Sequence, residues 1–116
     1  MGHSPKGHLT LEGPITQERL HRIIRRSGAI RAGATIDPDR RRKEYENEGY
    51  SGIMYYSKTQ NMTVAEDKLF EIRVPSANDQ AKSNAQSEPG YVYVIVGERV
   101  ITGGGGSSWW SSCIIL

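Results

Sequence analysis

Residues 90–96, with the sequence GYVYVIV, form the most strongly predicted strand of the chain. Aromatic and β-branched residues alternate along this segment with an almost continuous apolar character, which predicts a central strand of a sheet. The strand follows residues 74–89, a polar stretch without aromatic side chains that we expect to be a long mobile loop.

A strand, a sharp turn and a helix are predicted within residues 29–45. Residues 29–35 are small and β-permissive, so they predict a strand. Asp37 is a preferred N-cap residue and Pro38 suits the first helical position, so a helix should begin there and end near Gly49.

Two more helices are predicted on either side of this unit. Residues 15–28 place apolar side chains at helical spacing with arginines between them, which predicts an amphipathic helix capped by Thr16 and ended by Gly28. The helix has no aromatic anchor, so docking on a sheet is favoured over lying on a membrane. Residues 61–72 predict the other helix, with Thr63 and Glu66 in a capping box.

Residues 50–58, with the sequence YSGIMYYSK, predict another strand, which can bulge at Gly52. Together the elements predict an α/β (α+β) fold with a small three- or four-stranded, mainly antiparallel sheet flanked by about three helices. At 116 residues the chain has room for one domain and tails. We expect a flexible N-terminus over residues 1–13, one globular domain over 14–102, and a Gly/Ser tether with a tail over 103–116.

Positive charge is concentrated in the first half of the chain, although the formal net charge is only +2. One side of the molecule should therefore be basic, which suits nucleic acid or an anionic membrane surface. A solvated arginine-rich surface without a ligand is the alternative. The candidate binding residues are Arg22, Arg25, Arg26, Arg31, Arg40, Arg42 and Lys43.

The only cysteine, Cys113, precedes the last three residues of the chain. The tail, with the sequence CIIL, looks like a CaaX prenylation box, and Trp109 and Trp110 could supply part of the second signal for anchoring. A frayed hydrophobic end is the alternative. We expect an intracellular protein, membrane-associated if a prenyltransferase modifies Cys113 and otherwise cytoplasmic or nuclear, because one cysteine permits no intramolecular disulfide.

Three segments together resemble the GIY-YIG nuclease family. Residues 31–35, RAGAT, stand where the family has Tyr-Ile-Gly-x-Thr, and Arg41 falls at the spacing of the family's arginine, with Tyr45 one turn later. Residues 65–69, AEDKL, resemble the helix with the metal-binding glutamate. Residues 89–95, PGYVYVI, look like the first strand of the family but lie at the C-terminal side. The resemblance covers about residues 29–97 and requires a circularly permuted order.

This resemblance implies a magnesium-dependent endonuclease. Arg41 would neutralise charge on the phosphate, Tyr93 would orient or deprotonate the attacking water beside Tyr45, and Glu66 would hold Mg²⁺. Each residue also has a purely structural explanation: Tyr93 as a core residue, Arg41 as a surface charge and Glu66 as the partner in a capping box. The alternatives are a non-catalytic, prenyl-anchored module that binds anionic lipid or a protein partner, and an interaction domain unrelated to nucleases.

Overall fold

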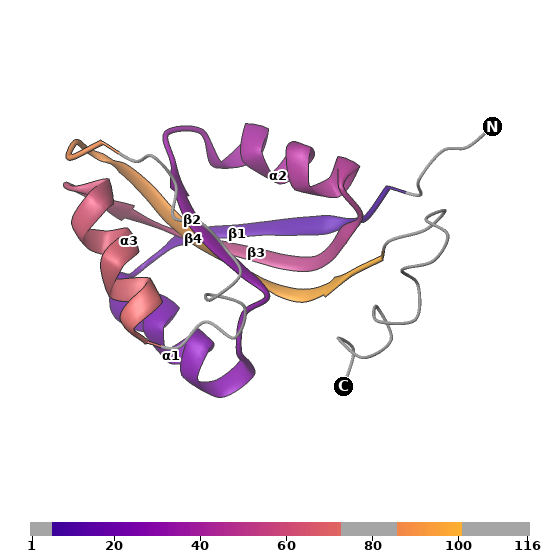
Figure 1. Ribbon diagram of the computed structural model, residues 1–116, viewed down its shortest axis with the longest axis horizontal. Helices are drawn as coiled ribbons and strands as arrows, with labels where there is room; N and C mark the ends of the chain where they lie inside the picture. Colours follow the sequence, from indigo (N-terminus) through magenta and orange to yellow (C-terminus); the bar gives the residue numbers. More distant parts are fainter. Residues whose placement is uncertain (1–5, 73–85, 101–116) are drawn as a thin grey trace.

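Four strands form one sheet in the order β1-β3-β4-β2 in the computed structural model, which describes residues 6–72 and 86–100. Figure 1 shows the arrangement. The strands are β1 (Leu9–Ile15), β2 (Arg31–Thr35), β3 (Tyr50–Thr59) and β4 (Gly90–Arg99). β4 pairs antiparallel with both β2 and β3, whereas β1 pairs parallel with β3. The α+β fold class is confirmed, with a mixed sheet.

The last strand, β4, lies inside the sheet between β3 and β2, as its apolar sequence predicts. Val92, Tyr93, Val94 and Ile95 are all buried, because strands flank β4 on both edges and helices cover both faces. Val100 continues the pairing, since its N–H donates to the carbonyl oxygen of Gly49 at 2.9 Å.

Three helices cover the two faces of the sheet: α1 (Gln17–Ser27), α2 (Pro38–Asn47) and α3 (Met62–Glu71). α2 lies on one face, and α1 and α3 lie together on the other (Figure 1). Each face has its own core. The core between α2 and the sheet contains Leu9, Tyr45, Tyr50, Met54, Tyr93 and Ile95. The core under α1 and α3 contains Leu20, Ile24, Ala29, Ala32, Ala34, Met62, Ala65, Leu69, Val92 and Val94.

Side-chain caps begin all three helices. The Thr16 hydroxyl accepts from the Arg19 N–H, and the Asp37 carboxylate accepts from the Arg40 N–H, as predicted. The predicted cap of α3 is wrong. Asn61 caps this helix by accepting from the Val64 N–H at 3.1 Å, so Thr63 already lies inside it.

Residues 9–13, predicted to be part of a flexible N-terminus, instead belong to β1. Leu9 is buried in the core under α2, and its N–H donates to a Glu46 carboxylate oxygen at 2.7 Å. This burial and the parallel pairing with β3 stabilise a strand whose sequence contains Gly13 and Pro14 and no aromatic residue, so it gives little local strand signal. The globular domain therefore begins before residue 14.

The predicted bulge at Gly52 is also wrong, because Gly52 pairs with Gly97 in an unbroken β3–β4 register. The glycine is required for another reason: its φ is +133°, and a Cβ there would lie 2.1 Å from the carbonyl oxygen of Val96. The irregularity of the sheet lies in β1 instead, between Glu12 and Ile15. Most of the predicted loop, residues 74–85, and the predicted tether and tail lie outside the described residues.

Candidate nucleic-acid interface

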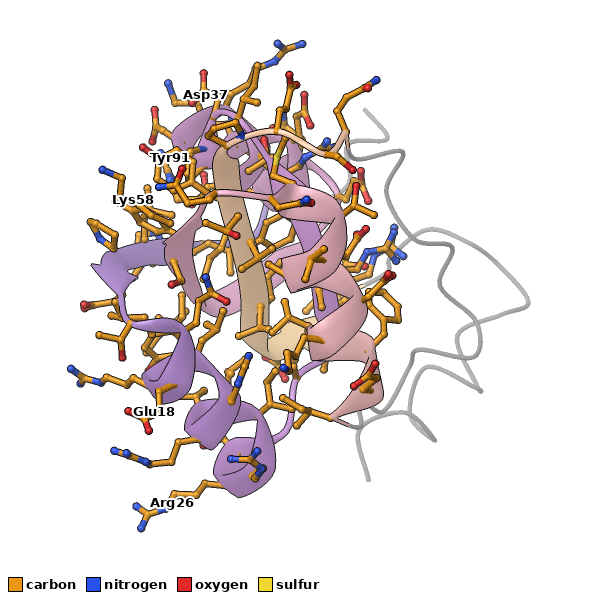
Figure 2. The ribbon with its side chains drawn as sticks, turned by 90° about the vertical axis from the view of Figure 1, so that its left-hand side faces the viewer. Glu18, Arg26, Asp37, Lys58 and Tyr91 are labelled. Carbon is orange, nitrogen blue, oxygen red and sulfur yellow. The ribbon has the colours of Figure 1, made fainter. Side chains whose placement is uncertain are left out.

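The arginines of α1 are presented to solvent on a helix whose residues Leu20 and Ile24 are buried against the sheet. These two residues, 0% and 2% exposed, pack into the core under α1 and α3. The polar side of the helix therefore faces outward, and Figure 2 shows Arg26 pointing away from the body. The exposed arginines of this helix are Arg19, Arg22, Arg25 and Arg26.

None of these four arginines forms an ion pair with another described residue. Glu18 is the only acidic residue within α1. The helix thus offers guanidinium groups whose hydrogen-bonding capacity is available to an external anion. His21, on the same helix, is half-buried, and the pKa of its imidazole is lowered by burial and by the charges of Arg25 and Lys68.

The cations of α2, in contrast, are paired within the helix. Arg40 and Arg41 both reach Glu44, with N···O distances of 3.5 and 3.1 Å. Arg42 contacts two carboxylates, Asp39 and Glu46, each at 3.0 Å. The remaining cation, Lys43, lies 3.5 Å from Asp39. The pKa of Asp39 is lowered chiefly by its hydrogen bond with Arg42, so this carboxylate stays charged and paired.

A buried tyrosine pair lies beneath α2. The hydroxyl groups of Tyr45 and Tyr93 are hydrogen-bonded at 2.7 Å. Burial and the neighbouring Tyr45 raise the pKa of Tyr93 far above its ordinary value, although the positive charges of Arg41 and Arg31 oppose this shift. Tyr93 is 1% exposed. Its hydroxyl is therefore neutral, hydrogen-bonded and removed from solvent.

Arg31 extends this group at the neighbouring strand β2. Its guanidinium lies 5.7 Å from the centre of the Tyr45 ring. Burial, the largest single influence, lowers the pKa of Arg31, but a hydrogen bond to Tyr45 and the electrostatic effects of Tyr45, Tyr50 and Tyr93 together outweigh it and raise the pKa. The Nε atom of Arg31 is buried without a hydrogen bond to any described residue. The structure therefore brings Arg31, Arg41, Tyr45 and Tyr93 together on the α2 side of the sheet.

Glu66 does not join this group. Glu66 is buried on α3, and α3 packs on the face of the sheet opposite to α2. The sheet thus separates Glu66 from Tyr93. Among residues 6–72 and 86–100, no cluster of three or more His, Cys, Asp or Glu side chains could hold a metal ion. Cys113 lies outside the described residues.

Comparison with known protein families, curated proteins and solved structures found no match. In the described part of the chain, no helix has the length and apolar character needed to cross a bilayer.

The different pairing of the two basic helices is the feature that sequence reasoning missed. A signal for it exists: Glu44 and Glu46 lie three or four residues after arginines of α2, and Asp39 lies three or four residues before Arg42 and Lys43. Side chains at these spacings meet on a helix surface. In α1 the only acidic residue, Glu18, lies four residues before Arg22, so the same rule predicts unpaired Arg19, Arg25 and Arg26 but a paired Arg22, which the structure leaves without an ion pair among the described residues.

Proposed function

We propose that this protein binds nucleic acid without cleaving it, through the exposed face of α1. The observation that carries the proposal is the set of exposed arginines on α1 that have no ion pair within the described residues. A polyanion is the natural partner for such a surface. The paired cations of α2 contribute less, because a phosphate would have to displace their carboxylates first.

The geometry of α1 suits a phosphate backbone. Arg19 and Arg26 lie roughly 10 Å apart along the helix axis at 1.5 Å per residue. Arginines between them share the exposed side, so several phosphates in succession can be contacted by planar guanidinium forks. Each such contact releases condensed counterions, and binding would weaken steeply with salt.

Binding is favoured over cleavage by the positions of the residues that the family resemblance singles out. The hydroxyl of Tyr93 is buried against Tyr45 and has a raised pKa, which makes it a poor general base. Glu66 lies on α3, which packs on the other face of the sheet, so it does not join the Tyr45–Tyr93 group. Arg31, where the family has a tyrosine, adds a fixed cation beside the pair.

Nucleic acid is favoured over a membrane surface because the apolar residues Leu20 and Ile24 of α1 are already buried in the protein. An interfacial helix instead buries its apolar face in the lipid. Prenylation of Cys113 would anchor the chain independently of α1, and it stays a prediction from the tail sequence.

Charge reversal on each helix tests the proposal. Arg22→Glu with Arg26→Glu changes α1 and should weaken binding of a labelled oligonucleotide at least about tenfold at low salt, with a flatter dependence of log K on log salt. The matched control, Arg40→Glu with Lys43→Glu, makes the same change of net charge on α2 and should weaken binding much less. Fluorescence anisotropy measures both. Equal losses in the two variants would show that only net charge matters and would overturn the proposal.

A further inference from the structure

Tyr56 and Tyr91 form an aromatic pair on β3 and β4. The rings meet edge to face, with centroids 5.6 Å apart and planes at 75°. Both rings lie on the α2 side of the sheet, because Tyr56 is directly opposite Tyr93 in the register. Each tyrosine is partly exposed, and Tyr91 belongs to neither buried core. The pair therefore presents aromatic surface to solvent.

Lys58 links this aromatic pair to the start of α1. Lys58 lies directly opposite Tyr91 in the β3–β4 register and is exposed. Its carbonyl oxygen accepts a hydrogen bond from the Gln17 side chain at 3.1 Å, which holds the first turn of α1 against the end of β3. A shallow hollow of about 430 Å³ lies at this junction. It is lined by Pro14, Ile15, Thr16, Gln17, Ser57 and Lys58.

Figure 2 shows Tyr91, Lys58, Glu18 and Arg26 in this order, from the α2 side of the sheet to the far end of α1. Tyr91 and Lys58 are adjacent, and Glu18 and Arg26 follow along α1. Beyond Tyr91 lies Asp37, whose negative charge disfavours phosphate at that end. The aromatic pair, Lys58 and α1 thus form a surface that runs around the end of β3. The pair and Lys58 lie on the α2 side of the sheet, α1 lies on the other side, and the Glu18 carboxylate lies between Lys58 and Arg26.

We propose that this surface binds single-stranded nucleic acid, with a base stacked on Tyr91 and Tyr56 and the adjoining phosphates held by Lys58 and the arginines of α1. The inference rests on the proposed function and specifies its ligand. Stacking on aromatic side chains requires an unpaired base, because bases in a duplex already stack on one another. It also tolerates any base, so binding should be largely independent of sequence.

Removal of the Tyr91 ring tests the inference in the full-length chain. Stacking contributes about 1–3 kcal/mol per base by alanine substitution, which corresponds to a loss of roughly 5- to 150-fold in affinity. Tyr91→Ala should show this loss for a twelve-residue oligothymidine. Tyr91→Phe, which keeps the ring, should bind nearly as tightly as the wild type, and Tyr91→Leu, which keeps apolar bulk for folding, should behave like Tyr91→Ala.

Inorganic polyphosphate serves as the matched probe, because it has the charge but no bases. Tyr91→Ala should bind polyphosphate within about twofold of the wild type, whereas Lys58→Ala should weaken both ligands. The inference is overturned, and the proposed function kept, if Tyr91→Ala and Tyr91→Leu bind oligothymidine like the wild type, or if the wild type prefers a duplex of equal length. Absence of binding to all three probes by the wild type overturns both.

Discussion

The two arginine-rich helices α1 and α2 have similar compositions of basic residues but opposite electrostatic surroundings. α2 carries its own carboxylates one helical turn from its cations, and they neutralise one another. α1 has Glu18 at its first turn and a run of arginines beyond it with no partner among the described residues. A count of basic residues would rank the helices as equals. The pairing of those residues distinguishes a structural surface from a surface available for binding.

The difference also explains what each helix contributes to the fold. α1 is fixed by its apolar stripe, so its arginines contribute little to stability. In α2 the ion pairs order the side chains of the helix and connect it to β1 through Glu46, which accepts from the Leu9 N–H. Three predictions test this contrast.

The largest expected change in stability comes from the buried apolar side of α1. Leu20→Ala removes a side chain that is 0% exposed and should lower the free energy of unfolding by about 2–5 kcal/mol. Urea denaturation followed by circular dichroism measures the change. Val64→Ala is the control, because Val64 is 60% exposed and its truncation should stay within about 0.5 kcal/mol. A small loss for Leu20→Ala would mean that α1 is not docked and could present its apolar side to a membrane.

A smaller effect is expected from one arginine on each helix. Arg42→Ala breaks contacts with Asp39 and Glu46 and should cost roughly 1 kcal/mol of stability. Arg22→Ala breaks no ion pair in the described part of the chain and should stay within about 0.5 kcal/mol. Parallel urea titrations compare the two variants. Equal losses of stability in the two variants would contradict the distinction between the ion-paired arginines of α2 and the unpaired arginines of α1.

The smallest expected effect is a pH dependence through His21. Its pKa in the folded protein is lowered by burial and then by Arg25 and Lys68, with Glu18 opposing. The unfolded chain therefore binds more protons below about pH 6.5, and stability should fall slightly as pH falls through that region. A phosphate beside α1 would raise the pKa of His21, so affinity for an oligonucleotide should rise as the pH falls through the same region.

His21→Gln is the control for this prediction. The substitution removes the titrating group and should flatten both pH profiles between about pH 5 and 7. An affinity that rises equally in the variant would assign the proton uptake to another group.

Local signals in the sequence were sufficient for most of the helices and strands. Thr16 and Asp37 could be recognised as caps because an N-cap is defined by residues within one turn. β1 could not, since its sequence includes Gly13 and Pro14 and no aromatic residue, and the strand is stabilised by pairing with β3. The cap of α3 was misplaced by two residues because Asn61 and Thr63 are both good capping residues.

The candidate site was less predictable than the fold. Ion pairing within α2 follows from spacing along one helix and could have been predicted. The contact of Tyr56 with Tyr91 depends on the register between β3 and β4, which the sequence leaves open. The separation of Glu66 from Tyr93 depends on which face each helix covers, a property of the whole topology.

The central claim is that α1, and not α2, is the binding surface. Its most direct test is to follow backbone amide chemical shifts by NMR during titration of the full-length protein with an oligothymidine. The largest changes should fall on residues 17–27 and around Lys58 and Tyr91, with little change at the exposed residues of α2. Changes centred on Arg31, Arg41 and Tyr45 instead would contradict the account and place the ligand over the buried tyrosine pair.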